Sequence, residues 1–120
     1  MAQLRNVQRR LLQHALGYPE AYEDHPWEES VAKVGKKIFV FLGSPGPDHI
    51  GVTVKLPDAA NFALTFPFAE PAGYGLGKAG WVMCKFGPGD DPPIGLLEDW
   101  IDESYRAVAP KKLVKLLDER

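Results

Sequence analysis

Two β-forming runs, separated by a segment dense in turn-forming residues, constrain the fold of this chain most strongly. Residues 37–42 are β-branched and aromatic, and residues 51–56 alternate apolar and polar side chains, as in a strand with one wet face. The Gly-Ser-Pro-Gly-Pro-Asp segment at 43–48 must lie in a surface loop. A third run, 31–34, leads into the first through Gly35 and Lys36. Because both connections are short, the sequence predicts an antiparallel three-stranded meander.

Apolar residues at helical spacing mark both ends of the chain. Between residues 4 and 16 they recur at steps of three and four, and Gly17 followed by Pro19 ends this predicted helix. Asp91 before Pro92 predicts the start of a second long helix, because Asp accepts free N–H groups and Pro suits the first helical position. The buried stripe of that helix is expected to consist of Leu97, Trp100, Ile101, Tyr105 and Val108.

The remaining segments complete the expected order of elements. Residues 18–30 form an acidic, proline-containing connector, and residues 58–64 predict a short helix. A loop rich in Gly and Pro at 67–80 precedes a further strand at 81–86, and residues 111–117 predict a last, basic helical segment. The expected fold class is therefore α+β, with a mostly antiparallel sheet covered by helices on one face, in two layers.

Length and composition indicate one globular domain spanning residues 1–120. The 120 residues are 45% hydrophobic with a formal net charge of −2, which excludes a histone-like DNA-packaging protein and a disordered chain. The longest apolar run, 38–42, is far shorter than the roughly 20 residues that cross a bilayer, so no membrane association is expected. No secretory signal is visible, which favours a cytoplasmic protein.

No combination of residues predicts catalysis. Gly75, Gly77 and Gly80 match the dinucleotide pattern G-x-G-x-x-G, but that motif needs a strand before it and a helix after it. Here a segment with Pro67, Pro71 and Gly73 precedes it and the predicted strand 81–86 follows, so a loop that enters a strand through left-handed glycine angles is the favoured interpretation. Cys84 lies in an apolar strand, where a thiol behaves as a small hydrophobic group. The three His residues are scattered along the chain. We therefore expect a protein that is not an enzyme and that has no cofactor and no metal site.

Several stretches, taken in order, resemble the MmcQ/YjbR family of small bacterial proteins. They are His-Pro-Trp at 25–27, Lys-Val-Gly-Lys-Lys-Ile-Phe at 33–39, Gly-Tyr-Gly-Leu-Gly-Lys at 73–78 with Trp81, and Ile-Asp-Glu-Ser-Tyr-Arg at 101–106. The resemblance implies an α-β(3)-α-β(2)-α fold in two layers, similar to secretion chaperones, and a DNA-binding role. It runs from the first helix to about residue 113.

Two interpretations of function stay open at this stage. In the first, the protein binds nucleic acid in a regulatory role: Lys33, Lys36, Lys37 and Lys78 contact phosphates, and Trp81 or Tyr74 stacks on a base if the target is single-stranded. The alternative, which the many acidic residues of 90–103 favour, is that these lysines are ordinary solvated ends of helices and strands. In the second, the protein is a small protein-interaction or ligand-binding module, with a protein partner or a second copy of itself. The edge that would bind the partner consists of Phe68, Tyr74, Gly75 and Gly77.

Overall fold

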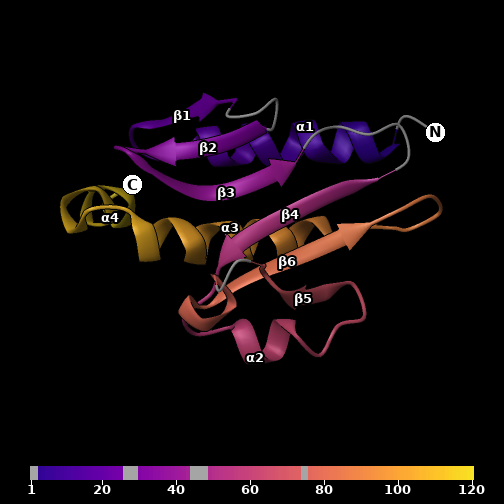
Figure 1. The fold of residues 1–120 in the computed structure, drawn as a ribbon. Coiled ribbons are helices and arrows are strands. Elements are labelled where there is room, and N and C mark those ends of the chain that lie inside the picture. Colours follow the sequence, from indigo (N-terminus) through magenta and orange to yellow (C-terminus); the bar gives the residue numbers. More distant parts are fainter. Residues whose placement is uncertain (1–2, 26–29, 44–48, 74–75) are drawn as a thin grey trace.

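The computed structural model of the chain describes residues 3–25, 30–43, 49–73 and 76–120 (Figure 1). Its strands form one antiparallel sheet in the order β1-β2-β3-β4-β6-β5. The strands are β1 (Ala21–Asp24), β2 (Ser30–Val34), β3 (Lys37–Gly43), β4 (Ile50–Lys55), β5 (Ala69–Pro71) and β6 (Trp81–Phe86). The helices are α1 (Gln3–Leu16), α2 (Ala60–Ala63), α3 (Ile94–Val108), α4 (Lys111–Asp118) and the short 3₁₀ helix η2 (Leu76–Ala79).

Helices α1 and α3 pack side by side on one face of the sheet, and α3 lies along β3 and β4 (Figure 1). Alternation along the strands separates the two faces, as β4 shows: Ile50, Val52 and Val54 are buried, while the residues between them are only half-buried. The predicted α+β class, with helices on the sheet, is therefore confirmed. None of the helices in the part of the chain that the structure describes is long and apolar enough to cross a membrane.

The predicted meander and the predicted stripe of α3 are both present. Strands β2, β3 and β4 are adjacent and antiparallel, as the two short connections require. On α3, Val108 is half-buried, and the fully buried members of the expected stripe are Leu97, Trp100, Ile101 and Tyr105. Tyr105 stacks on Tyr18 with ring centroids 4.7 Å apart, which holds the end of α1 against α3.

Strand β1 and the start of α3 differ from the prediction. The supposed connector 18–30 contains β1, which pairs with β2 from Ala21–Val34 to Asp24–Val31 and is an edge strand of the sheet. Its side chains are mostly exposed, so charged residues are compatible with it. Helix α3 begins at Ile94 rather than beside Asp91. Pro92 is followed by Pro93, and a residue that precedes proline is disfavoured in the helical region, so the helix cannot readily start at Pro92.

The loop predicted at 67–80 also contains regular structure. Strand β5 pairs with β6 from Ala69–Cys84 to Pro71–Val82, and η2 follows it. Gly80 has a φ of +91°, a backbone conformation that glycine adopts most easily, and leads directly into β6.

Strands β3 and β4 pair over a short distance and then diverge. Their register contains only the pairs Val40–Val54 and Phe41–Thr53, whereas β4 and β6 pair from Ile50–Phe86 to Lys55–Trp81. A register shift between β2 and β3 leaves Phe39 without a partner residue on β2, as in a β-bulge. The divergence lies toward the Lys37 end of β3, with α3 behind it (Figure 1).

Ser104 of α3 bridges the diverging strands. Its hydroxyl donates a hydrogen bond to the Phe39 carbonyl and accepts one from the Lys55 N–H at 2.8 Å. Ser104 is fully buried, so it replaces two hydrogen bonds that a continued β3–β4 ladder would otherwise supply. The strands can therefore separate at this end without leaving these two backbone groups unpaired.

Candidate functional site

A pocket of about 330 Å³ opens where β3 and β4 diverge, at the end of the sheet beside the C-terminus of α3. Strand β6 and η2 supply the rest of its wall. We call it the basic–aromatic pocket; it is lined by Lys36, Lys37, Ile38, Phe41, Lys55, Leu76, Trp81, Ala107 and Val108. Three cationic side chains and two aromatic rings thus share one hollow whose other lining residues are apolar.

None of the described residues that line the pocket beside the three lysines is acidic. Lys36 and Lys37 are exposed in and after the β2–β3 turn, and Lys55 is half-buried at the end of β4. Among the ion pairs within the described ranges, none includes these three lysines. Because no described carboxylate offsets them at close range, their charges are available to attract an anion.

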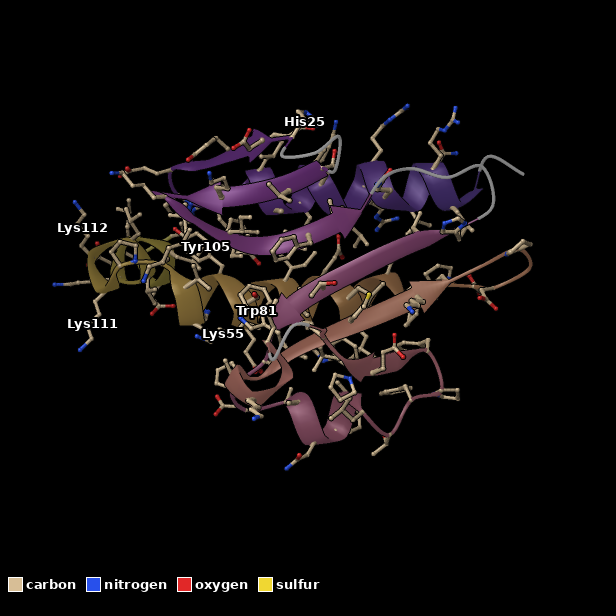
Figure 2. All side chains as sticks on the ribbon, viewed as in Figure 1. His25, Lys55, Trp81, Tyr105, Lys111 and Lys112 are labelled. Carbon is tan, nitrogen blue, oxygen red and sulfur yellow. The ribbon has the colours of Figure 1, made fainter. Side chains whose placement is uncertain are left out.

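Two aromatic rings, those of Phe41 and Trp81, form part of the pocket wall. Phe41 and Trp81 meet edge to face, with ring centroids 5.7 Å apart and an interplanar angle of 71°. The sheet register places them: Lys55 pairs directly with Trp81 across β4 and β6, and Phe41 pairs with Thr53 across β3 and β4. Lys55 and Trp81 therefore lie beside one another (Figure 2), and the alternation along β4 and β6 points both away from the buried side of Val54 and Val82. A T-shaped pair leaves at least one face of each ring uncovered by the other.

Two of the lysines predicted as phosphate contacts lie apart from this pocket. Lys33 of β2 is paired with Asp24 at 3.2 Å, and its ammonium lies 6.0 Å from the centre of the Tyr22 ring. The His25 N–H and then Lys33 lower the pKa of the Asp24 carboxyl, in keeping with this pairing. Lys78 is exposed on η2; it does not line the pocket, although Leu76 of the same short helix does.

The residues proposed for a partner-binding edge are dispersed. Phe68 is half-buried and points into the structure, where it stacks on Phe66 with centroids 5.0 Å apart and packs against Phe86. Gly77 lies so close to β5 that a Cβ there would come within 2.8 Å of the Pro71 Cβ, so its lack of a side chain has a packing reason. Tyr74 and Gly75 lie outside the described residues.

Lys55 is the lysine of the described pocket lining that sequence reasoning missed. The alternation of apolar and polar residues over 51–56 places the Lys55 side chain on the solvent-facing side of a strand, and this alternation is visible in the sequence. Its position beside Trp81 depends on the pairing of β4 with β6, two strands separated in sequence by α2, β5 and η2. Lys36, Lys37 and Trp81, by contrast, were predicted and are brought together.

Further basic residues follow the pocket along the chain. Ala107 and Val108 of α3 line it, and α4 begins immediately afterwards at Lys111. Figure 2 shows Lys111 and Lys112 projecting outward from α4, at the same end of the molecule as the C-terminus of α3. The positive charge at this end therefore extends beyond the pocket itself.

The sequence of the chain matches one protein-family model, described as YjbR, over residues 16–107. The matched range begins at the end of α1 and ends next to Val108, so it includes every pocket residue except that one. No curated protein gives a significant match.

Proposed function

The chain belongs to the YjbR family, and on this premise we propose that it is a non-enzymatic DNA-binding protein that uses the lysines of the basic–aromatic pocket. The observation that carries the proposal is the convergence of Lys36, Lys37 and Lys55 beside Trp81, with no acidic residue among the described lining residues. The DNA-binding role is the one that the family resemblance implies. Because the proposal assigns no catalytic group, the protein would act by occupying its target, as a regulator does.

Local charge, rather than net charge, supports phosphate binding here. The chain as a whole carries a formal charge of −2, but association with DNA depends on the lysines that face the phosphate backbone. Each neutralised phosphate releases counterions and contributes about −0.9 to the slope of log K against log salt. Three contacts from the pocket therefore predict a slope of about −3.

Fluorescence anisotropy with labelled DNA, titrated between about 50 and about 200 mM salt, tests this proposal. We expect K36Q/K37Q to weaken binding and to reduce the salt slope by about 2, one unit for each lysine removed. K33Q/K85Q is the matched control: it also removes two positive charges, but Lys33 and Lys85 already pair with Asp24 and Glu70. This control is expected to keep most of the affinity.

Two results would contradict the proposal. The first is the absence of binding at low salt to duplex and single-stranded DNA alike. The second is an equal loss in K36Q/K37Q and K33Q/K85Q, because it would mean that only total charge matters and that the pocket has no special part.

An exposed apolar group favours a second candidate, protein interaction. Phe62 of α2 is 55% exposed and Leu64 just after it is 38% exposed, so these two neighbouring side chains, unlike the inward-facing Phe68, offer apolar surface to a partner. We propose that a protein partner or a second copy of the chain would bind at this point. Molar mass in solution tests the second copy: a dimer that Phe62→Ser converts to a monomer supports it, and a wild-type monomer at high concentration contradicts it.

A further inference from the structure

We infer that the basic–aromatic pocket takes an unpaired nucleobase together with its phosphate, so that the protein binds single-stranded nucleic acid in preference to duplex. The inference rests on the proposed function and names the substrate class for the same site. Its physical basis is the combination of the Trp81 ring, an apolar wall and three lysines in one hollow.

The ring of Trp81 can bind a base only where the face of that base is free. In a duplex both faces of each base are covered by its neighbours in the stack, whereas an unpaired base can leave the stack and lie on an aromatic side chain. Trp81 lies at the start of β6 with Phe41 edge to face beside it, so the two rings meet at an angle and do not cover both faces of one another. This arrangement of the two rings suits a planar ligand.

The size of the pocket and its apolar residues favour a base over an inorganic anion. Its volume of about 330 Å³ lies at the low end of the roughly 300–1,000 Å³ usual for small-molecule sites, which fits one nucleotide unit and not the width of a double helix. Ile38, Leu76 and Val108 add apolar wall that a phosphate alone would not use. Water released from this wall favours an aromatic ligand.

The lysines are placed to hold the phosphate of the same nucleotide. Lys55 pairs with Trp81 across β4 and β6, so a base on the Trp81 ring would bring its phosphate within reach of this ammonium group. Lys36 and Lys37 are exposed and line the pocket from the β2–β3 turn, where a continuing backbone could pass. Base stacking and backbone contact, the two components of single-strand recognition, thus meet at one site.

The test compares a labelled single strand of about 10 nucleotides with the duplex of the same sequence at one salt concentration, and with free thymidine monophosphate. We expect the single strand to bind at least about tenfold more tightly than the duplex. Trp81→Ala should reduce single-strand affinity by about 5- to 150-fold, the loss of one stacked base, and leave duplex affinity unchanged. Trp81→Phe, which keeps a ring, should retain the preference.

Tryptophan fluorescence gives a readout that does not depend on the stability of Trp81→Ala. The single strand should quench the fluorescence of the wild type, and this quenching should disappear in Trp81→Phe, which retains Trp27 and Trp100. Equal affinity for the two DNA forms, or quenching that survives in Trp81→Phe, would overturn the inference and leave the proposed function standing. Thymidine monophosphate that binds as tightly as the strand would also overturn it. Failure of both DNA forms to bind would instead refute the proposed function.

Discussion

Replacing the buried Ser104 by Ala should destabilise the protein more than removing an exposed hydroxyl such as that of Ser30. Ser104 is fully buried and its hydroxyl links α3 to both β3 and β4, through the Phe39 carbonyl and the Lys55 N–H. Alanine has nearly the same size, so the substitution removes the two hydrogen bonds and changes little else. No neighbouring strand residue can replace them, because the β3–β4 register ends at Val40–Val54.

The expected size of the effect follows from those two bonds. A buried polar group that loses its partner costs about 1–3 kcal/mol, and the Phe39 carbonyl is such a group. The Lys55 N–H is only partly buried, so its loss is closer to the net value of an ordinary hydrogen bond, about 0.5–1.5 kcal/mol. Together they predict a decrease of about 2–4 kcal/mol in the free energy of unfolding.

Urea denaturation followed by circular dichroism measures this change. Ser30→Ala is the matched control, because the Ser30 hydroxyl bonds to Glu23 at 3.3 Å in an exposed position. The control should lie within about 0.5 kcal/mol of the wild type. If Ser104→Ala costs no more than Ser30→Ala, the hydroxyl does not satisfy buried backbone groups, and the explanation of the strand divergence is wrong.

Three further predictions concern other parts of the molecule. Burial raises the pKa of the Cys84 thiol to about 12, so a thiol reagent at pH 8 should label it only in urea; rapid labelling of the folded protein would contradict its burial. Burial, and then Asp102, raise the pKa of the Tyr18 hydroxyl, so its contribution to stability is complete below about pH 10 and decreases as the pH rises further. Tyr18→Phe should therefore reduce the fall in the free energy of unfolding at alkaline pH. An unchanged dependence of that free energy on pH would refute this prediction. Arg106 bonds Asp102 and Asp118 at 2.7 Å each and fastens α4 to α3; Arg106→Gln should cost about 0.5–1 kcal/mol in low salt and less in 1 M NaCl, and a salt-independent loss would contradict an ionic link.

The sequence predicts those parts of the fold in which hydrophobic periodicity and short connections agree. The meander of β2, β3 and β4 and the buried stripe of α3 are of this kind. Strand β1 is not: its four residues, Ala-Tyr-Glu-Asp, are mostly exposed, so they carry no alternation of apolar and polar side chains. It is a strand because β2 offers a free edge, and that is a property of the assembled sheet.

The residues of the candidate site were likewise predictable only where local sequence patterns specify them. Lys36 and Lys37 are local features of a predicted turn, and Trp81 begins a predicted strand, so sequence reasoning could select them. Their convergence with Lys55 needs the register between β4 and β6, which no short-range pattern specifies. The pairing of Lys33 with Asp24 likewise depends on β1, the strand that the sequence did not reveal.

The pocket and the buried Ser104 are two consequences of one interruption in the sheet. Phe39, the residue that the β2–β3 register skips, packs its ring against Tyr105 in the core with ring centroids 5.1 Å apart, and the β3–β4 pairing ends at the next residue, with Val40–Val54. Ser104 binds the two backbone groups that this interruption leaves without a strand partner. The separated strands leave room between Lys37 and Lys55, where Ala107 and Val108 of α3 also line the pocket. A continuous β3–β4 ladder would hold the ends of these two strands side by side, with no hollow between the two lysines. The same local defect that requires a buried hydroxyl in α3 therefore creates the concave surface on which the proposed function depends.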